Sequence, residues 1–225
     1  MKILVTGGSK GLGKEIVKLF LQNNWEVIYT YYQDNVSIDG AIGVYCDVRK
    51  ESDVKKLFEN ITDLDVIVNN AGISIDNKLE DKSSEEFRTV LDTNLVGAFN
   101  VIKYGSKKIK KGSIINISST NGIDTNYVLS MDYDASKAGL ISLTHNMAAY
   151  LAPDIRVNCV APGWMNTSMN EDMFPEFRQV EEDKILLRRF AEPFEVAEVV
   201  YFLASDKASY INDTVIRVDG GVKWT

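Results

Sequence analysis

Thr6-Gly7-Gly8-Ser9-Lys10-Gly11-Leu12-Gly13 connects two predicted elements near the start of this 225-residue sequence. It follows an apolar run at Ile3–Thr6 that predicts a strand, and it leads into an amphipathic pattern that predicts a helix over Gly11–Asn23. Glycines here permit a tight turn and let a diphosphate approach the backbone, while the helix start supplies free N–H groups. The sequence predicts a phosphate-binding turn, with a plain strand-to-helix corner as the alternative. It is no P-loop, because no Gly-Lys-Ser/Thr closes it.

Strand-like and helical patterns alternate along the rest of the chain. We expect strands over Trp25–Tyr31, Ala41–Tyr45, Asp65–Asn69, Ser113–Ser118, Arg156–Ala161 and Thr214–Val218. We expect helices over Glu51–Asn60, Ser84–Lys110 with a break near Thr93–Gly97, Tyr133–Leu151 and Pro193–Ala204. Strands such as Ile114–Ile117 are apolar almost throughout, which indicates burial on both faces. The sequence therefore predicts an α/β fold with a doubly wound parallel sheet of about seven strands and helices on both faces, in a single domain over 1–225.

The composition limits the classes of function. A hydrophobic fraction of 45% supports a large core, and a net charge of −7 argues against general nucleic-acid binding. The strand expected at the first residues leaves no room for a signal peptide, and no apolar run approaches bilayer length. We therefore predict a cytoplasmic protein without membrane contact. Cys46 and Cys159 are interpreted as buried thiols, and the single histidine, His145, without a His/Cys cluster predicts no metal site.

Tyr133 and Lys137 are the first candidates for catalysis. They stand four positions apart in a predicted helix, so both side chains project from one face. An ammonium next to a phenol favours the phenolate and would move the tyrosine pKa from about 10 toward neutrality. That chemistry suits proton transfer at a carbonyl oxygen. The spacing recurs at Tyr104 and Lys108, but we interpret that lysine-rich segment as a solvated helix end away from the ligand edge.

Several other segments place polar or glycine residues at the carboxyl ends of predicted strands. In a parallel sheet this edge forms the ligand crevice. Besides the glycine turn, these segments are Asn69-Asn70-Ala71-Gly72, Ser118-Ser119 and Pro162–Thr167. Asn94 adds a poor helix former in the middle of a helical region. It marks either a kink with a functional use or an exposed position, and the residue alone does not decide between them.

With these motifs together, the chain resembles the classical short-chain dehydrogenase/reductase family over essentially its whole length. The resemblance rests on Thr6–Gly13, Asn69–Gly72, Asn94, the Ser119/Tyr133/Lys137 set, Pro162-Gly163 with Thr167, and Val218-Asp219-Gly220-Gly221. The C-terminal motifs are most similar to those of 3-oxoacyl-[acyl-carrier-protein] reductase-like members. The resemblance implies a Rossmann-type sheet and an oxidoreductase that transfers a hydride between a nicotinamide and a carbonyl or secondary alcohol, with a 3-oxoacyl thioester as one candidate substrate.

The resemblance also implies roles for individual residues. Tyr133 would be the general acid or base, Lys137 would lower its pKa, Ser119 would bind the substrate oxygen, and Asn94 would anchor a relay water. The implied cofactor-binding residues are Gly7, Ser9, Lys10, Gly11, Leu12, Gly13, Asp47, Val48, Asn70, Ala71, Gly72, Tyr133, Lys137, Pro162, Gly163, Met165 and Thr167. The interval from Ser119 to Tyr133 looks one residue longer than is usual in the family, which keeps Thr120 as an alternative to Ser119.

The predicted cofactor is NADP(H). Sites for NAD usually place a carboxylate about 20 residues past the glycines, and here the positions near Thr30 and Tyr31 carry none. Lys10, inside the turn, could pair with a 2′-phosphate. NAD(H), with Asp34 reaching back to the ribose, is the alternative.

The segment at about 164–190 lies where the family has a substrate lid. Its apolar residues, such as Trp164 and Phe177, either favour an apolar or acyl-like substrate or only pack the lid onto the core. The family implies a homotetramer or dimer in which Ser84–Lys110 and Tyr133–Leu151 pair across an interface. The alternatives are an NAD-dependent alcohol or sugar dehydrogenase and a non-catalytic dinucleotide-sensing protein.

Overall fold

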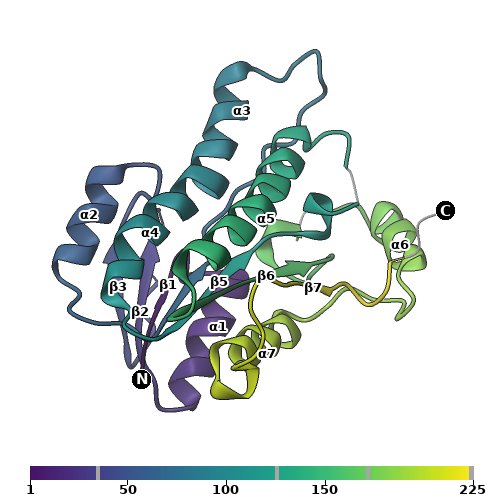
Figure 1. The fold of residues 1–225 in the computed structure, drawn as a ribbon. Coiled ribbons are helices and arrows are strands. Elements are labelled where there is room, and N and C mark those ends of the chain that lie inside the picture. Colours follow the sequence, from purple (N-terminus) through teal and green to yellow (C-terminus); the bar gives the residue numbers. More distant parts are fainter. Residues whose placement is uncertain (34–35, 125–126, 171–172, 223–225) are drawn as a thin grey trace.

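The computed structural model describes residues 1–33, 36–124, 127–170 and 173–222. At its centre is one seven-stranded sheet in the order β3-β2-β1-β4-β5-β6-β7, with all neighbouring strands parallel (Figure 1). The strands are β1 (Lys2–Val5), β2 (Glu26–Tyr31), β3 (Ala41–Tyr45), β4 (Val66–Asn69), β5 (Gly112–Ile117), β6 (Ile155–Pro162) and β7 (Val215–Val218). The strand order reverses between β1 and β4, which is where doubly wound sheets form their ligand crevice. The predicted fold class is confirmed.

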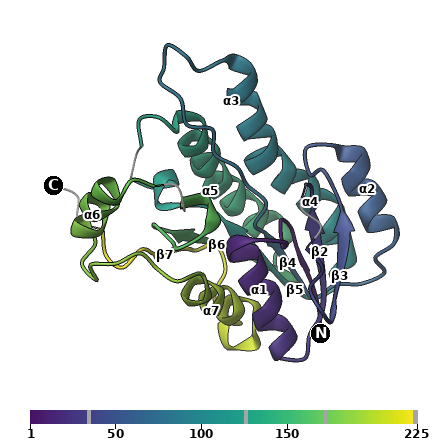
Figure 2. The same cartoon turned by 180° about the vertical axis from the view of Figure 1, so that it is seen from behind.

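Helices cover both faces of the sheet. On one face α1 (Gly11–Gln22) packs against α7 (Pro193–Ala204), as the view from behind shows (Figure 2). On the other face lie α2 (Glu51–Glu59), α4 (Gly97–Gly105) and the long α5 (Met131–Leu151). The remaining helices are α3 (Ser84–Leu91), which precedes α4, and α6 (Pro175–Lys184), which lies outside the layers. No helix in the described part of the chain is both long and apolar enough to cross a membrane.

The alternation of strand residues divides the core into two clusters. Successive residues of a strand point to opposite faces. Ile3 and Val5 of β1 therefore pack with α1 and α7, whereas Leu4 between them packs with α2 and α4. All three side chains are fully buried. A sheet apolar on both faces needs helices on both faces, so this pattern dictates the layered architecture.

The predicted helical region over Ser84–Lys110 is divided in the structure. It consists of α3, a π-helical turn at Asp92–Val96, and α4, so a break is present where the sequence predicted one. Helix α6 was not predicted, because its sequence has few apolar residues and we treated it as part of a polar stretch. Pro175 in its first turn and Glu176 next to it are the start signals that the sequence did contain.

Candidate active site

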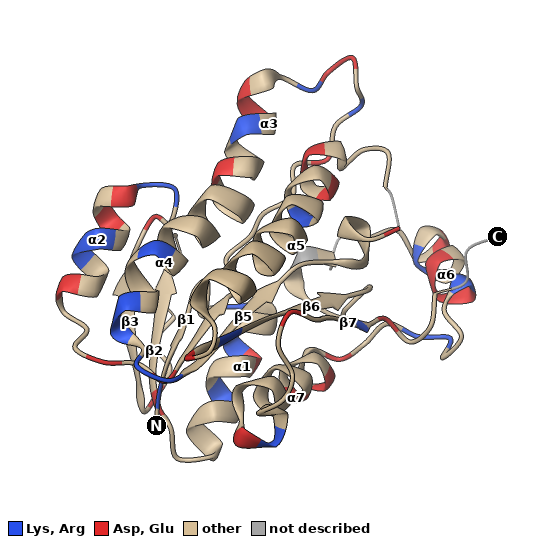
Figure 3. Cartoon of the chain, viewed as in Figure 1, with Lys and Arg blue, Asp and Glu red and all other residues tan. Residues whose placement is uncertain are grey.

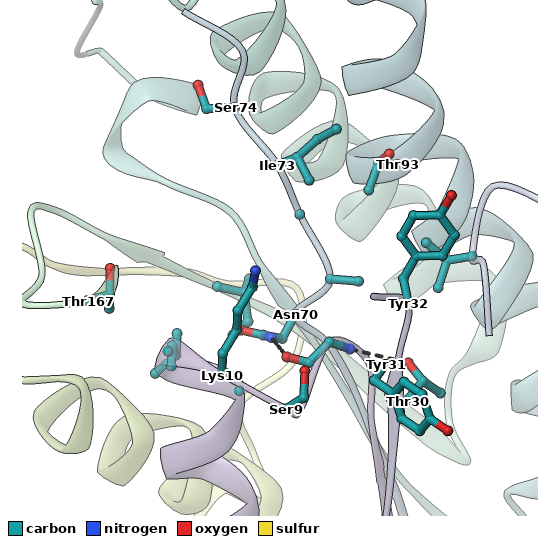
Figure 4. Close-up of a pocket in the computed structure, with 18 of the residues that line it drawn as sticks. Ser9, Lys10, Thr30, Tyr31, Tyr32, Asn70, Ile73, Ser74, Thr93 and Thr167 are labelled. Carbon is teal, nitrogen blue, oxygen red and sulfur yellow. Dashed lines mark hydrogen bonds between the residues drawn. The ribbon is translucent and has the colours of Figure 1, made fainter. Parts of the chain in front are cut away.

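The glycine turn between β1 and α1 is fastened by side chains from the strands on both sides of β1. Asn70, after β4, donates from Nδ2 to the carbonyl oxygens of Thr6 and Gly7, both at 3.0 Å. Thr6 Oγ1 accepts the N–H groups of Asn70 and Ala71, also at 3.0 Å. From the side of β2, Thr30 Oγ1 accepts the N–H of Gly7 at 3.2 Å (Figure 4). Neighbouring strands therefore fix the shape of the turn.

Two glycines of the turn are required by its geometry. Gly7 has a φ of +63°, in the left-handed region that disfavours other residues. A Cβ atom on Gly13 would lie 2.3 Å from the carbonyl oxygen of Gly7 and 2.5 Å from Nδ2 of Asn70. The bare backbone at the N-terminus of α1 forms a cradle where N–H groups and the helix dipole favour an anion. These residues fit the diphosphate of a dinucleotide.

A cavity of about 740 Å³ opens next to this turn. Of the predicted catalytic residues, Ser119, Tyr133 and Lys137 line it, and Asn94 does not. Every residue predicted to bind the dinucleotide lines it: Gly7, Ser9, Lys10, Gly11, Leu12, Gly13, Asp47, Val48, Asn70, Ala71, Gly72, Tyr133, Lys137, Pro162, Gly163, Met165 and Thr167. Segments far apart in the sequence thus meet at one cavity.

The part of the cavity near β2 and β3 contains a cation that the sequence analysis did not single out. Arg49 donates from Nε and Nη2 to the two carboxylate oxygens of buried Asp47, both at 2.8 Å. Its guanidinium carbon lies 5.0 Å from the centroid of the Tyr32 ring. The hydrogen bonds from Arg49 hold the pKa of Asp47 below its ordinary value. Asp47 therefore lines the cavity as a paired carboxylate, with Arg49 and Tyr32 beside it.

Lys10 and the tyrosines after β2 approach the same part of the cavity from opposite sides. The side chain of Lys10 rises from the glycine turn, and Tyr32 stands across from it (Figure 4). Asp34, the alternative ribose ligand, lies outside the described residues.

Tyr133 and Lys137 lie one turn apart on α5 and border the cavity together. The Nζ atom of Lys137 is 5.3 Å from the centroid of the Tyr133 ring and donates to the carbonyl oxygen of Ile117 at 2.8 Å. Burial lowers the pKa of Lys137 to about 8. Burial also raises the pKa of Tyr133 to about 12, although a hydrogen bond with Ser119 acts in the opposite direction. Both groups are pushed toward their neutral forms.

The direction of the Tyr133 shift is opposite to the one expected from the sequence. We expected the charge of Lys137 to lower the tyrosine pKa from about 10. In the structure, loss of hydration around the phenol dominates, and the carboxylates of Asp134 and Asp76 raise the pKa of Tyr133 further. The phenol is therefore held in its protonated form, which is the form that donates a proton.

The structure distinguishes the three hydroxyl residues that follow β5. Ser119 lines the cavity and hydrogen-bonds with Tyr133. The hydroxyl of Ser118 donates to the carbonyl oxygen of Lys137 at 2.8 Å, so it serves to fasten α5. Thr120 is buried in a short 3-10 helix and does not line the cavity. The geometry therefore favours Ser119 over Thr120 as the hydroxyl next to Tyr133.

Asn94 lies behind the cavity wall, in the π-helical turn between α3 and α4. Its Oδ1 accepts the N–H of Ile73 at 2.8 Å, and its Nδ2 donates to the carbonyl oxygen of Ile73 at 2.9 Å and to Ser136 Oγ at 3.0 Å. The sequence left open whether Asn94 marks a kink or is exposed, and the structure shows a buried residue in a π-helical turn. The π-helical turn, a feature frequent at functional sites, turns the amide inward so that it supports the wall at Ile73.

Some lining residues gave no signal in the sequence. They are ordinary strand-end and helix residues whose direction depends on neighbouring elements. This group comprises Thr30, Tyr31, Tyr32, Gln33, Cys46, Arg49, Ile73, Ser74, Thr89, Thr93, Ile117 and Ser168. By contrast, the second Tyr/Lys pair is a surface feature as predicted, since the hydroxyl of Tyr104 donates to Glu51 at 2.8 Å in an exposed hydrogen bond.

The cysteines and the histidine take no part in this cluster of Ser119, Tyr133 and Lys137. Cys46 and Cys159 are buried free thiols, as predicted. His145 lies 2.6 Å from Asp213 at the surface. Within residues 1–33, 36–124, 127–170 and 173–222, no three His, Cys, Asp or Glu side chains are grouped so that they could hold a metal ion.

A parallel sheet with such a cavity at its switch point, next to a glycine turn, is typical of the class of Rossmann-type dinucleotide-binding proteins. A family model described as enoyl-(acyl carrier protein) reductase matches residues 7–223. The chain belongs to the short-chain dehydrogenase/reductase family. Its members include oxidoreductases that act on C=O and CH–OH groups.

Individual relatives agree with this assignment over nearly the whole chain. The chain is 37% identical to the 3-oxoacyl-[acyl-carrier-protein] reductase FabG of Thermotoga maritima, over 97% of this chain and 96% of the relative. A short chain dehydrogenase family protein from Francisella tularensis has a similar structure, with a TM-score of 0.90, 33% identity and coverage of 98% and 97%. The aldohexose dehydrogenase of Thermoplasma acidophilum is also similar, with a TM-score of 0.90, 31% identity and coverage of 98% and 92%.

The buried ammonium of Lys137 predicts a specific pH dependence of stability. Its pKa of about 8 in the folded protein lies below the ordinary value of about 10.4, so between these values the unfolded chain binds more protons. The free energy of unfolding contributed by this group therefore rises with pH over that interval. In urea unfolding from pH 7 to pH 10, wild type should gain about 2–3 kcal/mol relative to Lys137→Met.

Lys55→Met, which removes an exposed lysine of α2, is the matched control, and its stability curve should run parallel to that of wild type. Parallel curves for wild type and Lys137→Met would contradict a desolvated lysine at this position.

Proposed function

We propose that the protein is an NADP(H)-dependent reductase that converts a carbonyl group to a secondary alcohol, with the oxidation as its reverse. The observation that supports this most strongly is one shared cavity, bordered by the glycine turn and by Ser119, Tyr133 and Lys137. A dinucleotide-sensing protein without catalysis needs no such cluster of proton-handling groups. The proposed reaction uses every element of the cluster.

The proposed roles follow the geometry of these residues. A nicotinamide dinucleotide bound along the cavity would supply the hydride. Ser119 and Tyr133 bind the substrate oxygen, and Tyr133 gives up its proton as negative charge develops there. A pKa of about 12 keeps the phenol protonated at neutral pH, ready for the reductive direction. In oxidation the neighbouring ammonium of Lys137 stabilises the phenolate that must form.

Lys137 and Asn94 complete the proposed proton path. Lys137 Nζ lies at the cavity wall, where it can bind ribose hydroxyls as well as the carbonyl of Ile117. Asn94 is hydrogen-bonded to Ile73 and Ser136, and we assign to it the anchoring of a relay water.

The proposed preference for NADP(H) rests on charge. Lys10 enters the cavity from the glycine turn, and Arg49 borders it beside Asp47. Thr30 and Tyr31, where an NAD site would place a carboxylate, carry none. Two cations next to a ribose favour a 2′-phosphate on it.

The proposed substrate is a 3-oxoacyl thioester, which the FabG relative's name supports. Residues 164–190 would form a lid within a single domain over 1–225. Trp164 stacks on Phe190 at 5.6 Å between ring centroids, and Phe177 of α6 lies 5.9 Å from Tyr127, which precedes α5. An aromatic wall of this kind suits an acyl chain. A sugar is the second candidate, because the similar structure from Thermoplasma acidophilum is an aldohexose dehydrogenase.

We also propose that the protein assembles as a homotetramer or dimer through α4 and α5. Phe99 of α4 and Val96 in the turn before it are 43% and 40% exposed, and Tyr150 of α5 is 80% exposed. Leu140 on the same helix is buried, so it belongs to the core and leaves these three for a partner. Exposed apolar side chains on one face are typical of protein interfaces.

Replacing the proposed proton donor tests the function directly. Tyr133→Phe removes the hydroxyl and keeps the ring, so turnover should fall by about 10² or more while the dissociation constant for NADPH changes less than about twofold. Turnover is followed at the nicotinamide absorbance with a panel of ketones, 3-oxoacyl thioesters and sugars.

Tyr210→Phe, at a fully exposed position outside the proposed interface, should behave as wild type. Near-normal turnover of Tyr133→Phe would show that another group donates the proton.

Charge reversal at Lys10 tests the choice of cofactor. Lys10→Glu should weaken NADPH binding by about 10- to 100-fold, because a hydrogen bond between charged groups is replaced by repulsion. NADH binding should change far less. Lys14→Glu, one turn further along α1 and outside the cavity lining, is the control. Equal losses for both cofactors, measured by fluorescence titration, would remove the support for NADP(H).

A charge placed on the exposed apolar face tests the assembly. Phe99→Asp should lower the mass measured by light scattering after gel filtration, because burial of a carboxylate in an apolar interface is costly. Tyr210→Asp, at a fully exposed position, should leave the mass unchanged. A wild-type protein that elutes as a monomer would refute the proposed assembly.

A further inference from the structure

A buried ion pair lies at the start of α5, outside the lining of the cavity. Charged residues occur both in the segment that leads into α3 and in the first turn of α5 (Figure 3). Two of them meet: Lys82 Nζ lies 2.8 Å from Asp132 Oδ2, with side chains 3% and 0% exposed. Among the ion pairs between described residues, this is the one whose two side chains are both almost fully buried.

The pair joins the residue before Tyr133 to the segment opposite it. Asp132 Oδ1 accepts the N–H of Tyr133 at 2.9 Å, while Oδ2 binds Lys82. Lys82 Nζ also donates to the carbonyl oxygen of Ile75. One ammonium group thus connects the backbone next to the cavity with the first turn of α5.

Further hydrogen bonds run between the same two segments. Asp76 Oδ1 accepts the hydroxyls of Ser130 at 2.6 Å and of Ser74 at 2.7 Å. The N–H of Asn77 donates to the carbonyl oxygen of Leu129 at 3.1 Å. Since Ser74 lines the cavity, the cavity wall at Ile73 and Ser74 continues into a segment, up to Lys82, that is fastened to the start of α5.

An ion pair is a costly way to fasten two segments. Removing two charges from water costs several kcal/mol per ion, and an apolar pair of similar volume is often equally stable or more so. An apolar pair, however, makes no directional hydrogen bonds that would orient the two segments. The oxygens of Asp132 and the ammonium of Lys82 fix both distance and orientation through hydrogen bonds to Tyr133 and Ile75. The pair is therefore better explained by position than by stability.

We propose that Lys82 and Asp132 are positioning residues for carbonyl reduction, which hold the backbone at Tyr133 in register with the cavity wall at Ile73 and Ser74. Neither residue lines the cavity, so they act through Tyr133. The inference rests on the proposed function, because it takes Tyr133 as the proton donor. A displacement of about 1 Å between reacting groups can lower a rate by about 10²-fold.

The test separates position from stability with two variants. Lys82→Met alone leaves a buried carboxylate without its partner and should destabilise the fold, as measured by urea unfolding. Lys82→Met/Asp132→Leu removes both charges and should recover most of that stability. Its kcat should nevertheless stay at least tenfold below wild type, with the dissociation constant for NADPH within about twofold. A double variant with wild-type kcat would overturn the proposal, as would a loss of kcat that only follows the unfolded fraction.

The matched control is Lys103→Met/Glu51→Leu, which removes an exposed ion pair of 2.6 Å and should leave kcat unchanged. A second readout does not need a substrate. In protein labelled with ¹³C at the tyrosine Cζ, the Tyr133 signal, assigned with Tyr133→Phe, should shift or broaden in the Lys82/Asp132 double variant and stay unchanged in the control. An unchanged Tyr133 signal in the double variant would overturn the proposal. Absence of carbonyl turnover in wild type would instead count against the proposed function alone, and the NMR test would still apply.

Discussion

The hydrogen bonds of Asn70 to the backbone of Thr6 and Gly7 hold the site together. They cross the point between β1 and β4 where the strand order reverses, and they fix the glycine turn to the strand that leads to Ala71 and Gly72. The absence of a Cβ at Gly13 is part of the same constraint, because that atom would collide with both partners. The diphosphate cradle and the wall opposite Tyr133 are therefore set by one local network, and a change at any member alters both.

Desolvation governs the chemistry at the other end of the cavity. Burial favours the neutral forms of Tyr133 and Lys137, with the pKa of the phenol near 12 and that of the ammonium near 8. The proximity of Lys137, on which the predicted pKa shift of Tyr133 was based, affects this pKa less than the loss of hydration does. A neutral phenol that is hydrogen-bonded to Ser119 still carries its proton at neutral pH and can donate it. The same environment makes the phenolate costly, so the oxidative direction of the proposed reaction would depend more strongly on the charge of Lys137.

Local sequence was sufficient to predict those site residues whose positions depend only on the local backbone geometry. The glycine turn needs small residues at fixed offsets. Asp47 and Met165, which the family resemblance implied, follow strand ends, and this position brings them to the cavity. Arg49 and Asn94 show the limit. Whether Arg49 binds Asp47 or solvent, and whether Asn94 points inward, depends on tertiary packing and on a π-helical turn that has no clear sequence signal. Helix α6 escaped prediction for the same reason, since its contacts with Trp164 and Asn166 are tertiary.

The Lys82–Asp132 pair is the strongest case of this limit. Fifty positions separate its members, and each by itself looks like a solvated charge next to other charges. Only the folded chain brings them together and removes both from water. An unpaired charge at either position would destabilise the fold, so each residue requires the other. The segment from Ile73 to Lys82 therefore cannot shift without moving the start of α5. In the proposed reaction, the pair would thus keep the geometry at Tyr133 fixed independently of the residues that select the substrate.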